Sequence, residues 1–127
     1  WSSDVCSSDL YEKVKGLTIR TELVKEKAKN LNVIYTPIHG SGNVPVRSVL
    51  AQLGYSNVKV VKEQEAPDGN FPTASYPNPE NPDVFELAVK MAQAEKPDII
   101  FGTDPDCDRI GYINHLSYNY TVRSYIL

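Results

Sequence analysis

The sequence predicts an α/β fold: a single domain with a mainly parallel sheet flanked by helices, in an α/β/α sandwich. Short aliphatic runs alternate with stretches whose apolar residues recur every three to four positions, in the order strand, helix, strand, helix, strand. Such alternation is typical of a parallel sheet with crossover helices. The 127-residue chain is 41% hydrophobic and 23% charged, which is ordinary for one globular domain with its own core.

The first half of this pattern ends near residue 61. Residues 11–30 are charged and compatible with helix, and residues 32–35 have the composition of a short buried strand. A helix follows whose apolar residues share one face, namely Val46, Val49, Leu50 and Leu53. Asn43 is a candidate N-cap, and Gly54 should end the helix because glycine tolerates a left-handed C-terminal cap. A second strand is expected over residues 58–61.

The second half contains a long loop, a helix and two strands. Residues 63–82 are rich in proline, asparagine and glycine, and loops of this length are often functional. Asn81-Pro82 is a favourable helix start, with asparagine as the cap and proline in the first position. The helix should end before Pro97, because proline disfavours a helical conformation in the residue before it. Strands are expected over residues 98–103 and 109–113.

Both ends of the sequence differ from this pattern. Residues 1–10 contain Ser-Ser-Asp twice and no periodic apolar face, and we expect a non-native or disordered segment there. Residues 114–127 are rich in tyrosine and contain no acidic residue, so they are interpreted as a divergent tail. The domain is therefore predicted over residues 11–113.

Charge and cysteine content argue against several classes of protein. The net charge of −3 gives no general attraction to nucleic acid or to an anionic membrane. No apolar stretch approaches the roughly 20 residues that a membrane span needs. Cys6 and Cys107 are far apart and neither is in a C-x-x-C pair, so neither a disulfide framework nor a zinc site is expected. We expect a cytoplasmic protein without nucleic-acid or membrane partners.

The strongest functional signal is the segment Asp104-Pro105-Asp106-Cys107-Asp108-Arg109. The carboxylates of Asp104, Asp106 and Asp108 recur at every second position, directly after an apolar run. In an extended segment this spacing points side chains to the same side. Like charges so close repel one another unless a cation lies among them. Carboxylate oxygens suit a hard ion such as Mg²⁺ or Ca²⁺ better than zinc.

Other interpretations of this segment stay open. The simplest is a solvated surface turn. An EF-hand fits poorly, because the glycine and glutamate of that motif are replaced by Arg109 and His115. An aspartyl-phosphatase loop would use Asp104 as nucleophile, but Asp108 stands where such loops have threonine or valine. Cys107 lies between two acids that disfavour a thiolate, so it is interpreted as a small filler rather than a nucleophile.

A second loop, residues 36–42 (Thr-Pro-Ile-His-Gly-Ser-Gly), follows the first strand. His39 could contact a phosphate or cap a turn. Gly40-Ser41-Gly42 is neither a Walker motif nor a dinucleotide fingerprint, because the required lysine and third glycine are missing. In parallel sheets ligands bind beyond the carboxyl ends of the strands, so this loop and the acidic segment are expected on the same rim.

Four motifs in this order resemble the second domain of the α-D-phosphohexomutases, most closely the phosphoglucomutase/phosphomannomutase branch. The motifs occupy residues 36–42, 67–72, 76–79 and 103–109. The resemblance covers roughly residues 11–113. It implies a four-domain enzyme that moves a phosphoryl group between the 1 and 6 positions of a hexose phosphate, with a phosphoserine on another domain as the donor.

The resemblance also implies roles for single residues. Asp104, Asp106 and Asp108 would bind Mg²⁺ together with a phosphoserine oxygen. Arg109 would lie beside the transferring phosphoryl group, and His39 would line the same cleft. The serine, sugar-binding and phosphate-binding loops of the other domains are absent from this sequence, so we expect a fragment that is inactive alone. The alternative is a stand-alone divalent-cation-binding module without catalysis.

Overall fold

A computed structural model describes residues 4–114 and 123–126 of the chain. Its sheet has five strands in the order β2-β1-β3-β4-β5. The strands are β1 (Asn32–Thr36), β2 (Asn57–Val60), β3 (Ile99–Thr103), β4 (Arg109–Asn114) and β5 (Arg123–Ile126). β1 pairs in parallel with β2 and β3, whereas β4 pairs antiparallel with β3 and β5. Among the described strands only β4 therefore runs against the others, and the predicted α/β fold is confirmed.

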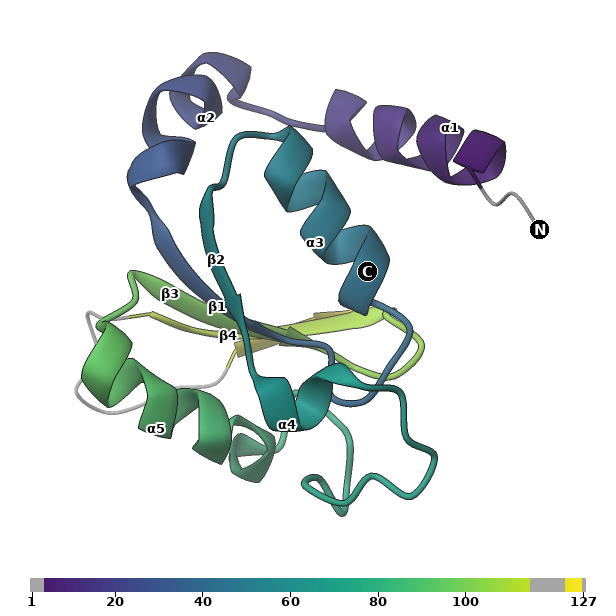
Figure 1. The fold of residues 1–127 in the computed structure, drawn as a ribbon, viewed down its shortest axis with the longest axis vertical. Coiled ribbons are helices and arrows are strands. Elements are labelled where there is room, and N and C mark those ends of the chain that lie inside the picture. Colours follow the sequence, from purple (N-terminus) through teal and green to yellow (C-terminus); the bar gives the residue numbers. More distant parts are fainter. Residues whose placement is uncertain (1–3, 115–122, 127) are drawn as a thin grey trace.

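Helices lie on both faces of this sheet. They are α1 (Asp4–Gly16), α2 (Thr21–Lys27), η1 (Ala28–Asn30), α3 (Asn43–Gln52), α4 (Lys62–Glu65), η2 (Pro82–Phe85) and α5 (Glu86–Glu95). Figure 1 shows α3 on one side of the sheet and α5 on the other, with α1 beyond α3. No helix in the described part of the chain has the length and apolarity that a membrane crossing requires.

The start of α3 differs from the prediction and its end agrees with it. Gly42 is the N-cap, and Asn43 is already the first helical residue, so the predicted Asn43 cap is wrong. The Asn43 side chain instead accepts a hydrogen bond from the Arg47 guanidinium at 3.2 Å, which satisfies it within the helix. Gly54 has a φ of +99° directly after the C-cap, as expected for a left-handed C-terminal residue.

The helix after the long loop begins and ends as predicted, but its first turn is tighter. The Asn81 side chain accepts from the Asp83 amide at 3.2 Å, and Pro82 occupies the first helical position. This first turn is a 3₁₀-helix, and the α-helical part begins at Glu86. Lys96 is left-handed, with φ 47° and ψ 60°, and ends the helix directly before Pro97.

The core lies on the α5 side of the sheet. Its buried members come from the strands, from the loops that follow β1 and β2, from η2 and α5, and from the long loop: Ile34, Ile38, Val61, Ala74, Val84, Phe85, Ala88, Ile100 and Ile113. α5 adds partly buried side chains to this cluster. By contrast, no residue of α3 is fully buried, and its predicted apolar face is only half-buried. The two faces of the sheet are therefore covered unequally.

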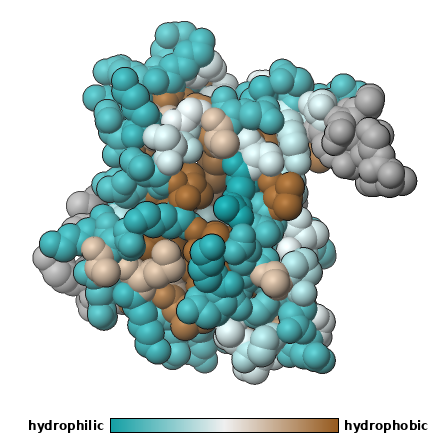
Figure 2. All heavy atoms as spheres, viewed as in Figure 1, coloured by the Kyte–Doolittle hydropathy of each residue, from teal (hydrophilic) through white to brown (hydrophobic). Residues whose placement is uncertain are grey.

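Hydrophilic residues cover most of the face seen in Figure 2, and hydrophobic residues gather there in smaller groups. Several large hydrophobic side chains are exposed in the described part of the chain, most of them on or next to α1 and α2: Leu10, Val14, Leu17, Ile19, Leu23, Val44 and Tyr76. Exposed apolar side chains that cluster in this way are typical of surfaces that pack against another part of a protein.

The two segments that were set apart in the sequence are partly described. α1 runs without interruption through the predicted boundary at residues 10–11, so residues 4–10 are helical, and their non-native origin stays a prediction. Residues 123–126 of the predicted tail form β5, which pairs with β4. The rest of these segments, residues 1–3, 115–122 and 127, lies outside the described residues.

Candidate metal site at the rim of the sheet

Two loops meet at the carboxyl ends of β1 and β3. The glycine loop (residues 37–42) follows β1, and the acidic loop (residues 104–108) joins β3 to β4. The backbone amide and the hydroxyl of Ser41 both donate to the carbonyl oxygen of Pro105, at 2.9 and 3.0 Å. The prediction that both loops lie on one rim is therefore confirmed.

The carboxylates of the acidic loop converge on one another. Asp104, Asp106 and Asp108 each offer one oxygen, and these atoms all lie within 4.8 Å of one another. Asp104 is buried, whereas Asp106 and Asp108 are exposed. Three carboxylate oxygens fit a hard cation and leave positions for water or phosphate oxygens. The donor set therefore fits Mg²⁺, although exposed acidic groups are also common without a metal.

The acidic loop is closed by its own hydrogen bonds. The Arg109 amide donates to a side-chain oxygen of Asp104 at 2.9 Å, and the Cys107 amide donates to the Asp104 carbonyl at 2.9 Å. Cys107 adopts a φ of 61°, a left-handed conformation that is uncommon for residues other than glycine. This tight turn brings alternate side chains together although the segment is not an extended strand.

Burial and mutual repulsion shape the charges of the cluster. Burial raises the pKa of Asp104 to about 6, and the neighbouring Asp106 and Asp108 carboxyls add to the increase. The pKa of Asp106 is lowered, chiefly by its hydrogen bond with Asp104. Below about pH 6, and without a bound cation, the proton of the cluster is therefore held chiefly at Asp104. A cation in this position would replace that proton.

The Arg109 side chain is available for an anionic ligand. Arg109 is the first residue of β4 and half-buried. Within residues 4–114 and 123–126, no hydrogen bond or ion pair of its guanidinium is found. A guanidinium offers several donors in a fixed fork that matches phosphate oxygens. The position beside the carboxylates is therefore compatible with its predicted role.

Cys107 has the properties of a filler. Burial is the main reason why the pKa of its thiol is raised, and this disfavours a nucleophilic thiolate. Its sulfur lies in a small space that is shared with the hydroxyls of Tyr35 and Thr103, which are 2.7 Å apart. Burial also raises the pKa of Tyr35, so this hydroxyl stays protonated. These groups pack beneath the two loops.

His39 is buried and forms hydrogen bonds within the protein. It is only 5% exposed, and its Nδ1 atom lies 3.0 Å from the Ala66 carbonyl oxygen. A carbonyl only accepts, so Nδ1 must carry a proton. Nε2 lies 2.9 Å from the Thr73 hydroxyl. Both ring nitrogens are therefore engaged with the long loop. This geometry favours the capping role over the phosphate contact, and a catalytic role for His39 stays a prediction.

A buried polar pair behind the glycine loop was missed by the sequence analysis. Gln64 is 1% exposed, and it accepts from the Thr36 hydroxyl at 2.6 Å and donates to the Val84 carbonyl at 3.1 Å. The backbone carbonyl of Gln64 accepts from the His39 backbone amide at 2.9 Å. Gln64 stands in the polar run Lys-Glu-Gln-Glu, in which no local signal distinguishes it from its exposed neighbours.

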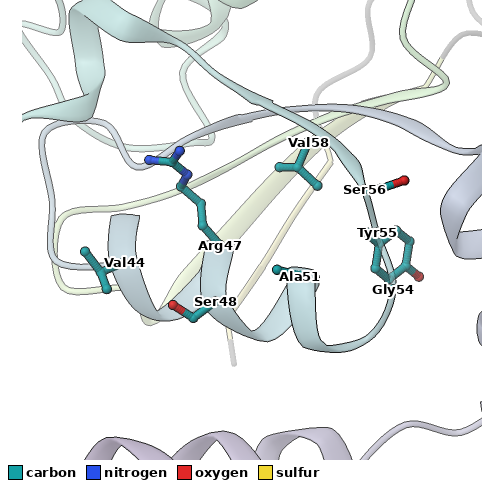
Figure 3. A pocket seen from close by; sticks show the side chains of 8 residues that line it. All are labelled: Val44, Arg47, Ser48, Ala51, Gly54, Tyr55, Ser56 and Val58. Atoms are coloured by element: carbon teal, nitrogen blue, oxygen red, sulfur yellow. The ribbon is translucent and has the colours of Figure 1, made fainter. Parts of the chain in front are cut away.

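A separate pocket lies beside α3 and contains none of the predicted site residues. It has a volume of about 670 Å³ and is lined by Val44, Arg47, Ser48, Ala51, Gly54, Tyr55, Ser56 and Val58. Figure 3 shows these side chains along α3 and the start of β2. Arg47, the charged residue in this lining, is already paired with Glu65 at 2.7 Å. The acidic loop is therefore the better candidate for chemistry.

Comparison with known proteins identifies similar sequences. The family model for phosphoglucomutase/phosphomannomutase, alpha/beta/alpha domain II, matches residues 11–116. A probable phosphomannomutase of Haemophilus influenzae is 39% identical over 94 residues, which cover 74% of this chain and 19% of that protein. A phosphoglucomutase of Staphylococcus saprophyticus is 37% identical over 108 residues, covering 78% and 20%. The chain thus spans about a fifth of the length of these curated relatives.

A solved structure has the same fold. The X-ray crystal structure of a phosphoglucomutase/phosphomannomutase family protein from Burkholderia thailandensis superposes with a TM-score of 0.58 at 20% sequence identity. The match covers 81% of this chain and 22% of that chain. At this level of identity the similarity supports the α/β architecture, while the family model and the curated relatives carry the family relationship.

Proposed function

Because the chain belongs to the phosphoglucomutase/phosphomannomutase family, we propose that it supplies the magnesium-binding loop for phosphoryl transfer on hexose phosphates. The observation that carries the proposal is the convergence of Asp104, Asp106 and Asp108 within 4.8 Å. The parent protein would be an intramolecular phosphotransferase of carbohydrate metabolism. Its hexose phosphate substrate would bind with the help of segments that are not in this sequence.

The proposed mechanism assigns separate tasks to the residues of the acidic loop. Asp104, Asp106 and Asp108 would hold Mg²⁺, which neutralises charge on the phosphoryl oxygens during transfer. Arg109, whose guanidinium has no partner within residues 4–114 and 123–126, would bind a phosphoryl oxygen and so stabilise developing charge. The closed turn from Asp104 to Arg109 would keep both functions in one unit, because the Arg109 amide donates to the Asp104 carboxylate at 2.9 Å.

A titration of Mg²⁺ into the 127-residue chain tests the metal site. We expect weak binding, with a dissociation constant on the order of millimolar. A small set of carboxylates binds Mg²⁺ only loosely when no phosphate oxygen completes the site. Asp106→Ala should abolish the binding. Asp83→Ala, which removes an exposed acid at the start of η2, is the control for net charge and should bind normally. Equal binding by Asp106→Ala and the unaltered chain would reject the site.

A cation-binding module without catalysis remains the second candidate. It is favoured by the lack of an evident nucleophile near the acidic loop in the described residues. The thiol of Cys107 has a raised pKa, and the Ser41 hydroxyl donates to Pro105. We therefore propose that the isolated chain does not turn over hexose phosphates. An assay with a hexose 1-phosphate and Mg²⁺ tests this, and turnover that exceeds the protein-free rate would contradict it.

The cellular setting stays a prediction. We propose a cytoplasmic location, which the lack of a disulfide framework in the sequence supports, and carbohydrate metabolism on phosphorylated sugars is compatible with it. Fractionation of cells that express the parent protein would test the location, and a secreted parent protein would contradict it.

A further inference from the structure

We propose that Ser41 is a positioning residue that fixes the acidic loop against the glycine loop and thereby sets the geometry of the three carboxylates. The proposal rests on the proposed magnesium site. It assigns to the Gly40-Ser41-Gly42 segment a mechanical role rather than the contact with phosphate that such glycine-rich loops often make.

Ser41 holds the acidic loop through one acceptor. Its amide and its hydroxyl donate to the same Pro105 carbonyl oxygen, at 2.9 and 3.0 Å. Pro105 lies between two of the carboxylate residues, Asp104 and Asp106. The two donors therefore fix the peptide between Pro105 and Asp106, from which the Asp106 side chain extends. The hydrogen bonds between Asp104, Cys107 and Arg109 close the loop upon itself and set its shape.

The glycines on either side of Ser41 allow this contact. A Cβ atom on Gly40 would lie 2.4 Å from Cα of Pro105, which is backbone and cannot turn away. A Cβ atom on Gly42 would lie 2.6 Å from the Tyr35 hydroxyl and 2.8 Å from that of Thr103. Only hydrogen fits at both positions without a shift of the two loops. The segment therefore fits closely against Pro105 of the acidic loop at Gly40, and against the side chains of β1 and β3 at Gly42.

The glycine loop is firm enough to act as a support. Ile38 and His39 both have positive φ, 48° and 57°, a costly conformation for a β-branched residue such as isoleucine. Such conformations persist only where the surroundings determine them fully. The Ile38 amide is held by the Thr36 hydroxyl at 3.1 Å, and the His39 amide by the Gln64 carbonyl at 2.9 Å. Ser41 therefore projects from a segment whose backbone is held in place by buried hydrogen bonds.

The ligands need such support because two of them are exposed. Asp106 and Asp108 have no burial to restrict them, and their charges repel one another when no cation is bound. Loss of the Ser41 hydroxyl would leave one donor instead of two on Pro105. The acidic loop would then sample positions in which the three carboxylates are spread, and the affinity for a cation would fall.

The experiment measures Mn²⁺ binding by electron paramagnetic resonance, with Mg²⁺ as competitor, beside thermal unfolding without metal. Ser41→Ala should weaken Mn²⁺ binding about three- to tenfold, the equivalent of one hydrogen bond. Ser41→Thr keeps a hydroxyl and should restore the affinity. Ser56→Ala removes another exposed serine and should change neither value. The unfolding temperature of Ser41→Ala should stay close to that of the unaltered chain.

A glycine pair gives an independent test. Gly40→Ala should weaken binding about tenfold or more, because a buried overlap must be relieved by moving the acidic loop. Gly69→Ala is the matched control, since a Cβ atom there meets nothing within 4 Å. If Gly40→Ala fails to fold, the serine series decides alone.

The outcomes separate this inference from the function on which it rests. Binding by the unaltered chain that Asp106→Ala abolishes, together with normal binding by Ser41→Ala, would overturn the positioning role and leave the metal site standing. An unaltered chain that does not bind Mn²⁺ would remove the metal site and with it the inference. Failure of Ser41→Thr to restore binding would also count against the hydroxyl.

Discussion

The two loops at the rim differ in how completely the fold uses their polar groups. In the glycine loop, His39 is buried and both its ring nitrogens have protein partners. In the acidic loop, Asp106 and Asp108 are exposed, and the Arg109 guanidinium has no partner among the described residues. A group whose hydrogen bonds are all made inside the protein has little left for a ligand. The difference assigns support to one loop and ligand binding to the other.

This comparison predicts that variants of the buried polar groups in and behind the glycine loop lower stability, whereas variants of the exposed acidic loop change binding. The largest effect is expected at Gln64. Gln64→Ala would leave the Thr36 hydroxyl without the acceptor for its proton and the Val84 carbonyl without its side-chain donor, both in the protein interior. We expect the free energy of unfolding to fall by about 3 kcal/mol, the sum of lost packing and unsatisfied polar groups. Urea denaturation measures it.

Glu63→Ala is the control for Gln64→Ala. Glu63 is the exposed neighbour on α4, and its removal should change the free energy of unfolding by less than about 0.5 kcal/mol. Similar losses in both variants would mean that α4 as a whole, and not the buried amide, supports the glycine loop.

A smaller loss is expected at His39. His39→Ala removes the hydrogen bonds to Ala66 and Thr73, so the free energy of unfolding should fall by about 2 kcal/mol. Chemical denaturation and phosphate binding would be measured on the same preparation. An unchanged stability with lost phosphate binding would reverse the assignment and favour the catalytic role that the resemblance implies.

The sequence predicted the acidic loop better than the glycine loop. Spacing reveals Asp104, Asp106 and Asp108 because charge repulsion is a local property of neighbouring residues. The strand order then placed both loops on one rim. The role of His39 could not be predicted in this way, because its partners Ala66 and Thr73 come from a long loop whose path is set by tertiary contacts.

The fold shows the same limit. Strands, the Gly54 terminus and the Asn81 cap follow from local patterns, and they agree with the structure. The Asn43 cap does not, because Asn43 bonds to Arg47 instead. The sequences of α3 and α5 also do not reveal that the two helices are buried unequally. Both have an apolar face, but only α5 packs against the main core.

The stability of the chain and its metal binding should both depend on pH through Asp104 in the acidic loop. Burial raises the pKa of Asp104 from its ordinary 3.8 to about 6, so the folded chain binds a proton more tightly than the unfolded chain. Without metal, the contribution of Asp104 to stability should therefore increase as the pH falls from about 7 through 6.

Metal binding should respond in the opposite direction, because a cation competes with that proton. Mn²⁺ affinity should be about tenfold weaker at about pH 5 than at about pH 7.5. Titrations at the two pH values measure it. Asp104→Asn removes the titrating group, so its residual binding should lose this pH dependence. An affinity of the unaltered chain that does not vary over this range would contradict the assignment of Asp104 as the protonated member of the cluster.

The smallest effect on stability is expected at Arg109. At this residue the difference between the glycine loop and the acidic loop is tested most directly. Arg109→Ala keeps the hydrogen bond from the backbone amide of residue 109 to the Asp104 carboxylate, so the free energy of unfolding should change by less than about 0.5 kcal/mol. Binding of inorganic phosphate in the presence of Mg²⁺ should nevertheless weaken, because the fork of donors is lost. Arg109→Lys, which keeps the charge without the fork, should bind phosphate with intermediate affinity. A large loss of stability in Arg109→Ala would show that the guanidinium serves the fold, and the contrast between the two loops would then disappear.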